Sequence, residues 1–207
     1  MAENTVFPDA RAEWLRRRWD WLARFYDMTH LKPEWRERLC REARGKTLEV
    51  GAGTGLNLPY YPPEVDLTLV DLSGGMLERA RKRAETLGRP VAIHQVDIER
   101  LDFPDESFDT VVATCVFCTV PNPVQGLREV RRVCRRDGQV LLLEHVRSMG
   151  TILGPVMDAL NPVLRSLNGT NINRRTVENV KASGLKIVSI TPLWRDILLE
   201  IKAVSRD

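Results

Sequence analysis

Residues 47–55, Thr-Leu-Glu-Val-Gly-Ala-Gly-Thr-Gly, decide the fold of this 207-residue chain. A short apolar strand runs directly into three glycines at alternate positions, Gly51, Gly53 and Gly55. Glycine adopts positive φ without strain, and the missing Cβ atoms let a ligand lie against the backbone. The stretch therefore predicts a β-strand followed by a loop that cradles a nucleotide-like cofactor.

The spacing of the glycines separates two classes of cofactor. The dinucleotide fingerprint G-x-G-x-x-G would need glycine at position 56, where the chain has Leu56. The pattern is instead E-x-G-x-G-x-G, which starts at Glu49 and points away from NAD. Further along, the next apolar run ends in Asp71, and a carboxylate at a strand end is placed to accept both hydroxyls of a ribose.

Strand-like and helix-like patterns alternate from residue 47 onward, which is typical of a parallel sheet with crossover helices. We expect parallel strands at residues 48–50, 67–70, 91–96, 110–114 and 140–143. We expect helices at residues 76–87, 123–136, 156–167 and 174–183, the last capped by Asn173. Strands at 185–191 and 197–204 have no long helix between them, which indicates an antiparallel hairpin. The predicted fold class is α/β, a Rossmann-like doubly wound sheet of mostly parallel strands with a C-terminal antiparallel hairpin and an N-terminal helical extension.

Length and composition indicate one well-buried α/β domain, because 207 residues are too few for two ordinary ones. We expect a helical lid or membrane-contact segment at residues 1–45 and the main domain at 46–207. The net charge of +3 is mild, so we expect no nucleic-acid partner. No apolar run reaches the roughly 18 to 20 residues that span a bilayer, and the N-terminus lacks a signal-peptide core. We therefore expect a cytoplasmic protein, with peripheral attachment to the inner membrane face as an alternative, and leave the oligomeric state open.

The cysteines and histidines indicate neither redox chemistry nor a metal. Four cysteines fit a reducing compartment, and the C-x-x-C of Cys115 and Cys118 follows a predicted strand instead of opening a helix. The three histidines show no metal-ligand spacing. We expect no metal site.

A second acid closes the third predicted strand. Asp97 is placed to accept a hydrogen bond from the exocyclic amine of adenine, while Ile98 packs against the ring. Acids from two neighbouring strands, together with the glycine loop, would then hold an adenosyl group.

These motifs resemble those of the class I S-adenosylmethionine-dependent methyltransferases. The resemblance is carried by residues 48–55, Val70-Asp71, Asp97-Ile98 and residues 108–112. Within the class, the chain is most similar to the ubiquinone/menaquinone C-methyltransferases and bacterial phosphatidylethanolamine N-methyltransferases. That similarity is carried by Tyr26-Asp27, residues 57–62 and residues 143–146. The stretch from Cys118 to Val146 is also similar to mammalian thiol methyltransferases.

The resemblance implies S-adenosyl-L-methionine as the cofactor and a set of residues that bind it. These are Tyr26, Glu49, Gly51, Ala52, Gly53, Gly55, Asn57, Asp71, Leu72, Ser73, Met76, Asp97, Ile98 and Cys115. The loop after the first motif departs from the family's usual helix, because Pro59, Pro62 and Pro63 interrupt it. We expect this loop to open the site toward the acceptor.

Few catalytic side chains are expected, because methyl transfer from a sulfonium needs orientation and a dry site more than acid chemistry. His145 and Glu144, at the end of the fifth strand, are the candidates to accept a proton or hold an ammonium substrate. Tyr26 is either a lid residue over the methyl donor or a core aromatic. A structural role for His145 also stays open.

Residues 10–26 form a basic, tryptophan-rich amphipathic pattern. Leu15, Trp19, Leu22 and Tyr26 fall at helical spacing among further tryptophans and five arginines. Such a helix lies in a bilayer interface or packs on the domain as a lid. A cluster near a helix start could similarly bind a phosphate headgroup; it comprises Asn171, Asn173, Arg174 and Arg175.

Together these features predict a methyltransferase that acts on an amphiphilic small-molecule or lipid acceptor, with the amine of phosphatidylethanolamine as the leading choice. A quinone ring carbon and a small thiol are the alternative acceptors. A non-catalytic scaffold or sensor that binds the cofactor is the alternative outside the enzymes.

Overall fold

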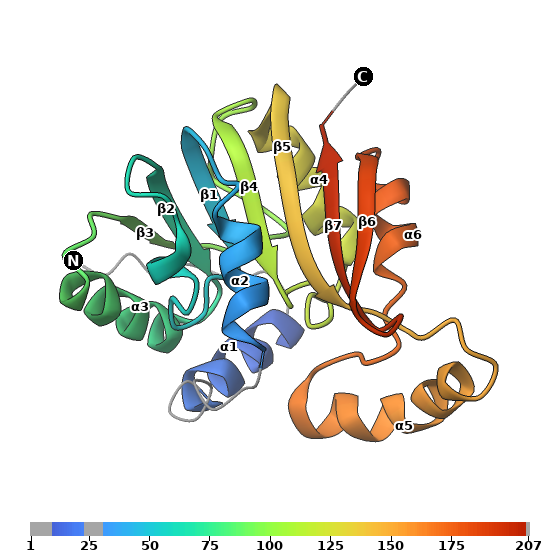
Figure 1. Ribbon diagram of the computed structural model, residues 1–207. Coiled ribbons are helices and arrows are strands. Elements are labelled where there is room, and N and C mark those ends of the chain that lie inside the picture. The colour runs from blue at the N-terminus through green and yellow to red at the C-terminus, as the bar shows by residue number, and fades with distance from the viewer. Residues whose placement is uncertain (1–9, 23–30, 206–207) are drawn as a thin grey trace.

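The computed structural model describes residues 10–22 and 31–205 of the chain. A seven-stranded sheet forms its centre, flanked by helices (Figure 1). The strands are β1 (Lys46–Val50), β2 (Asp66–Asp71), β3 (Ala92–Gln95), β4 (Phe108–Thr114), β5 (Cys134–His145), β6 (Lys186–Trp194) and β7 (Leu198–Val204). The helices are α1 (Ala10–Leu22), α2 (Pro33–Cys40), α3 (Gly74–Thr86), α4 (Pro123–Val133), α5 (Leu153–Asn168) and α6 (Thr176–Ala182), with a 3₁₀ turn, η2, at Leu58–Tyr60.

The strand order is β3-β2-β1-β4-β5-β7-β6. The first five strands in this order are parallel, whereas β7 pairs antiparallel with both β5 and β6. The chain reverses its direction of travel across the sheet at β1, which lies between β2 and β4. Open α/β sheets bind ligands at such a switch point, outside the carboxyl ends of the strands. The glycine loop after β1 and the acid that ends β2 therefore meet at one edge.

Adjacent residues of the central strands face two separate cores, because side chains alternate across a sheet. Val111 packs with Leu127 and Val180, which belong to α4 and α6. Val112, its neighbour, packs with Leu39 of α2 and Ala80 of α3. Both faces of the sheet are thus covered, which explains why its strands are nearly continuous apolar runs.

The predicted fold class is confirmed, including the closing hairpin, but several element boundaries differ from the prediction, and two of the differences have a clear cause. We expected a helix to Arg136, whereas α4 ends at Val133 and β5 begins at Cys134, which pairs with Phe108. Pairing with β4 overrides the helical pattern of the arginines that follow. Asn173 was expected to cap the helix at 174–183; instead Arg175 occupies the cap position, and the Asn173 Nδ2 donates to Asp158 at 3.0 Å.

Two helices lie at the carboxyl edge of the parallel strands (Figure 1). One is α1, which lies against the start of α3, and the other is α5, which follows the end of β5. Throughout residues 10–22 and 31–205, every helix is too short or too polar to cross a bilayer.

Candidate active site

The loop after β1 has a backbone that only glycine accommodates easily. Gly51, Gly53 and Gly55 have φ values of 62°, 56° and 76°, in the left-handed region. A Cβ on Gly51 would lie 2.5 Å from Cγ2 of Val116, and one on Gly55 would lie 2.7 Å from Cδ1 of Leu58. The loop is therefore a bare-backbone cradle, as the sequence predicted.

The carboxylate of Asp71 fastens this loop to the start of α3. Its Oδ2 accepts the Gly53 N–H at 2.9 Å, and its Oδ1 accepts the Ser73 N–H at 2.9 Å. Burial raises the pKa of Asp71, and the two backbone donors oppose that shift. Each carboxylate oxygen keeps a further lone pair, so the group can still accept hydroxyl donors from a ligand.

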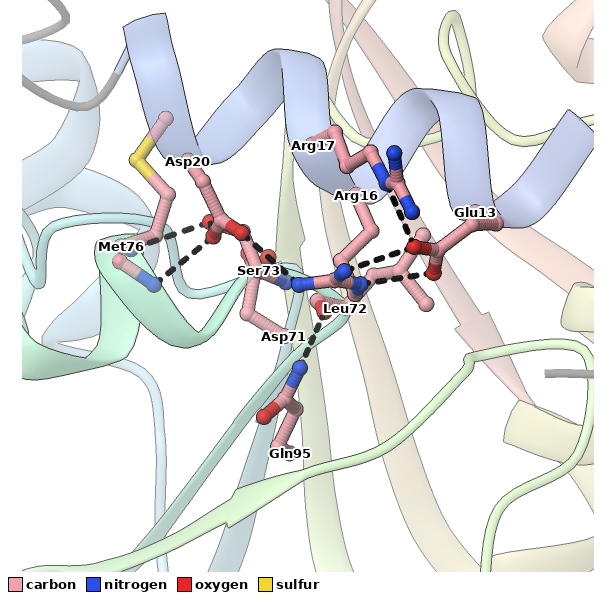
Figure 2. Close-up of polar contacts among 10 residues, drawn as sticks. Glu13, Arg16, Arg17, Asp20, Asp71, Leu72, Ser73, Met76 and Gln95 are labelled. Carbon is pink, nitrogen blue, oxygen red and sulfur yellow. Dashed lines mark hydrogen bonds and ion pairs between the residues drawn. The ribbon is translucent and has the colours of Figure 1, made fainter. Parts of the chain in front are cut away.

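Helix α1 is held against the same point by Asp20. Its Oδ1 accepts the Ser73 hydroxyl at 2.6 Å and the Gly75 N–H at 2.8 Å (Figure 2). A Cβ on Gly75 would lie 3.2 Å from Cα of Asp20, so glycine permits the close approach of the two helices. Trp19, beside Asp20 in the chain, lines a cavity at this edge of the sheet. Asp20 could not be singled out from the sequence, because an acid on a surface helix normally faces water.

A cavity of about 780 Å³, its open mouth included, lies at this edge of the sheet. Of the residues predicted to bind the cofactor, the cavity is lined by Gly51, Gly53, Asp71, Leu72, Met76, Asp97, Ile98 and Cys115. The sequence did not single out the wall formed by Val116, Thr119, Val120 and Pro121, which follows β4.

The Asp97 side chain is fixed at the rim of this cavity by a local turn, in which its Oδ1 accepts the Glu99 N–H at 2.9 Å. Ile98 beside it is buried. Across the cavity, the carbonyl of Leu72 accepts from Gln95 Nε2 at 2.9 Å (Figure 2). One polar rim and several apolar walls thus converge where an adenine ring is expected.

Other residues predicted to bind the cofactor lie behind the loop or beside it. Glu49 is fully buried: its Oε2 accepts the Tyr61 hydroxyl and its Oε1 accepts Asn57 Nδ2, both at 2.9 Å. Asn57 in turn accepts from Nη1 of Arg36 at 2.8 Å. Burial raises the pKa of Glu49 to about 7. These buried groups support the glycine loop without lining the cavity.

Three more predicted residues also lie outside the cavity lining. Ala52 and Gly55 belong to the loop, and Ser73 caps α3 by accepting the Met76 N–H at 3.1 Å. Tyr26 lies outside the described residues. Arg36 was missed by sequence reasoning, since a short helix ahead of the first motif gives no sign of which side chain turns inward.

The two acid–base candidates have different surroundings. Glu144 is fully buried, and its Oε1 accepts the N–H groups of Val116 at 2.9 Å and Phe117 at 3.3 Å. Burial raises the pKa of Glu144 to about 7. His145 is half-buried at the end of β5, and burial lowers its pKa. Neither residue is among those that line the cavity.

Cys115 follows β4 in a left-handed conformation, with φ of 55°, and its N–H donates to the Leu143 carbonyl at 2.8 Å. Burial raises the pKa of its thiol to about 12, and all four cysteines are free. A redox nucleophile needs a lowered thiol pKa, so the geometry does not favour such chemistry. In the part of the chain that the structure describes, no three His, Cys, Asp or Glu side chains converge as metal ligands would.

Comparison with known proteins agrees with this geometry. Residues 48–142 match a family described as a methyltransferase domain. Over 103 residues the chain is 48% identical to phosphatidylethanolamine N-methyltransferase of Cereibacter sphaeroides, which covers 49% of this chain and 51% of that protein. Over 114 residues it is 39% identical to the human thiol S-methyltransferase TMT1B, which covers 50% and 45%. The chain thus spans about half the length of the curated relatives it matches.

Solved structures of other proteins have the same fold. The crystal structure of YcgJ from Bacillus subtilis superimposes with a TM-score of 0.68 at 20% identity, over 84% of this chain and 97% of that one. S-adenosylmethionine is the cofactor of the family, and a glycine cradle, a strand-end acid and the cavity between them fit it. Residues 48–142 form a methyltransferase domain with the class I S-adenosylmethionine-dependent fold.

Proposed function

We propose that this protein methylates the amine of phosphatidylethanolamine, or of a closely similar amphiphilic lipid. The observation that carries the choice of acceptor is the 48% identity to a phosphatidylethanolamine N-methyltransferase. The cavity supports it, because an acceptor amine would meet apolar walls at Val116 and Val120 that exclude water.

The residues around the cavity would divide the cofactor among them. Asp71 would accept the ribose hydroxyls while keeping its two backbone donors, and Asp97 would accept from the adenine amine. The methionine part would lie against the backbone at Gly51 and Gly53. When bound, S-adenosylmethionine supplies a methyl group on a positively charged sulfur, ready for in-line attack.

A lipid amine is protonated in water and must lose a proton before it attacks. The lowered pKa of His145 keeps the imidazole neutral near pH 7. Because His145 does not line the cavity, it would accept that proton through a water molecule. Glu144 would act differently, because its carboxylate already accepts two backbone N–H groups. We assign it to positioning the wall at Val116 and Phe117.

We also propose that α1 acts as a lid over the donor. Trp19 lines the cavity and Asp20 bonds to the start of α3. The arginines of α1 that would attract a membrane are partly neutralised, since Arg16 pairs with Glu13 at 2.7 Å and with Asp20 at 3.0 Å. This pairing favours the lid over a membrane-contact role for α1.

A soluble thiol is the second candidate acceptor, supported by the identity to the human thiol S-methyltransferase. An activity assay distinguishes the two candidate acceptors. The full chain is incubated with methyl-labelled donor and either phosphatidylethanolamine vesicles or small thiols. Mass spectrometry then identifies the labelled product. Label on the lipid amine supports the first proposal, label on thiols alone supports the second, and cofactor binding without any transfer contradicts both.

Replacing Asp71 should weaken cofactor binding. In Asp71→Ala, the ribose acceptor and the link between the loop and α3 are both lost, at roughly 1.5 to 3 kcal/mol for each charge-assisted bond. We expect the dissociation constant to rise by about 10- to 100-fold in isothermal titration. Cys118→Ser is the matched control, because Cys118 is buried nearby without lining the cavity. Unchanged affinity in the aspartate variant would refute the assignment.

Replacing His145 should slow transfer without weakening cofactor binding. For His145→Gln we expect kcat with the lipid amine to fall by about 100-fold, a typical contribution of a general base. Raising the pH should restore part of the rate, because more of the free amine is then deprotonated in solution. An unchanged kcat, or a loss explained by weaker cofactor binding, would exclude His145 as the proton acceptor.

The buried carboxyl of Glu144 should make stability fall as pH rises. Its pKa is raised from 4.5 to about 7 in the folded protein, so the folded state binds the proton more tightly than the unfolded chain. The free energy of unfolding should therefore decline between about pH 4.5 and 7, by up to about 3 kcal/mol from this group. Glu144→Gln cannot titrate and should show a shallower decline.

Denaturant unfolding of both proteins at pH 5, 6, 7 and 8 measures this difference. The quantity to compare is the change in the free energy of unfolding per pH unit. The absolute values cannot be compared, because replacing the buried carboxyl by an amide can change stability by a constant amount at every pH. Equal slopes for the two proteins would mean that Glu144 is ionised in the folded state across this range.

A further inference from the structure

One face of α5 and of the turn before it is apolar and open to solvent. Six side chains recur at intervals of three or four residues, and between 45% and 80% of each is exposed. This spacing places them along one side of a helix. We call this set the α5 apolar face; it comprises Met149, Ile152, Val156, Leu160, Val163 and Leu167.

The α5 apolar face is not the side by which the helix attaches to the domain. Attachment runs through Met157, which is buried and whose sulfur accepts the Ser148 N–H at 3.4 Å. The rest of α5 projects from the body of the molecule at the edge of the sheet that holds the cavity (Figure 1). Monomeric proteins rarely leave a large contiguous apolar surface exposed unless something binds there.

The surroundings of this face carry positive charge. From Arg147 to Arg175 the chain has four arginines and a single carboxylate, Asp158. That carboxylate is already paired with Arg147 at 2.8 Å. Arg165 and Arg175 are exposed. Within α5, Arg165 lies on the side opposite the apolar face. An apolar face with arginine on the polar side of the same helix is the pattern that an anionic bilayer attracts and then accepts into its interface.

A tryptophan lies where a membrane anchor is expected. Trp194 ends β6 with 54% of its surface exposed, and Arg195 follows it in the turn to β7. The turn is fastened to the start of the α5 apolar face, because Asp196 accepts the Ser148 hydroxyl at 2.8 Å and the Met149 N–H at 2.7 Å. Indole rings at this position favour the headgroup level of a bilayer.

The far end of α5 is tied to the cavity wall. After the helix, the backbone and side-chain amides of Asn171 donate to the Cys118 carbonyl at 2.8 and 3.0 Å. Arg174 donates to the Val120 carbonyl at 2.9 Å. Thr119 and Val120 line the cavity, so a surface bound to α5 lies beside the wall of the cavity.

We propose that the α5 apolar face docks on an anionic lipid bilayer and holds the cavity mouth at its surface. We take a bilayer and not a second copy as the occupant because Trp194 and Arg195, in the turn fastened to the start of the face, are groups that the headgroup region favours. The inference rests on the proposed function only in taking the acceptor to be a lipid of that bilayer.

Vesicle flotation of the full chain tests the docking. We expect the wild type to float with vesicles of phosphatidylcholine and phosphatidylglycerol. The variant Leu160→Ser/Val163→Ser removes two exposed side chains, so the fold is kept, and its partition coefficient should fall by at least about tenfold. The matched control Val188→Ser/Ile190→Ser removes two exposed apolar side chains from β6 and should float like the wild type.

A wild type that stays in solution, or an α5 variant that floats as well as the wild type, overturns the docking proposal. Light scattering adds a further check, because a dimer that the α5 variant dissociates would assign the face to a second copy. All of these proteins keep α1 unchanged, so α1 cannot account for a difference among them.

Methylation assays separate a failure of docking from a failure of the proposed function. The α5 variant should lose activity on phosphatidylethanolamine in anionic vesicles and keep wild-type activity on dihexanoyl phosphatidylethanolamine dissolved as monomers. Equal losses on both substrates would overturn docking as the role of this face. If the wild type methylates neither form, the proposed acceptor is wrong, and flotation still decides whether α5 binds the bilayer.

Discussion

The carboxylate of Asp71 is the interaction on which the site depends. It joins the N–H of Gly53, in the loop after β1, to the N–H of Ser73, at the start of α3. Burying a charge is costly unless donors surround it, and two backbone N–H groups offset much of that cost here. The same point receives α1, because Asp20 bonds to the Ser73 hydroxyl and to Gly75. Three segments distant in the chain therefore converge on one strand end, and the cavity is the space left between them.

The parts of the site that could be predicted are those encoded by neighbouring residues. Glycines after a strand and an acid at the end of the next strand need only the alternation of strands and helices to be brought together. Arg36 and Asp20 could not be found in this way, because they lie on helices ahead of the first motif and their direction depends on how those helices dock. Glu144 shows why an acid at a strand end is difficult to assign from the sequence. An acid at a strand end resembles a site residue, yet its carboxylate is buried against Val116 and Phe117, and only folding reveals those partners.

The predicted end of α4 and the predicted cap of α6 were wrong for a related reason. The helical pattern of α4 continues through Arg135 and Arg136, and nothing local contradicts a longer helix. Pairing between Cys134 and Phe108 ends the helix at Val133, since extending β5 along β4 satisfies backbone groups that a solvent-exposed last turn would leave to water. Asn173 is a residue type that commonly caps helices, but its side-chain amide donates a hydrogen bond to Asp158 of α5 instead. In both places a contact between segments far apart in the chain outweighs local propensity.

Helices α1 and α5, at the carboxyl edge of the parallel strands, differ in chemistry. This difference makes one side of the cavity polar and the other apolar. In α1, Glu13 and Arg16 pair within the helix and Asp20 bonds to the start of α3, so this helix closes the side where the acids and the glycine backbone lie. The wall after β4 presents valines and a proline instead, and it is hydrogen-bonded to the segment that follows α5, the helix with the exposed apolar face. On the functions proposed here, the charged donor is held on the polar side and the acceptor arrives from the apolar side. A lipid suits this arrangement better than a fully soluble substrate, because only its headgroup has to leave the bilayer to reach the methyl group.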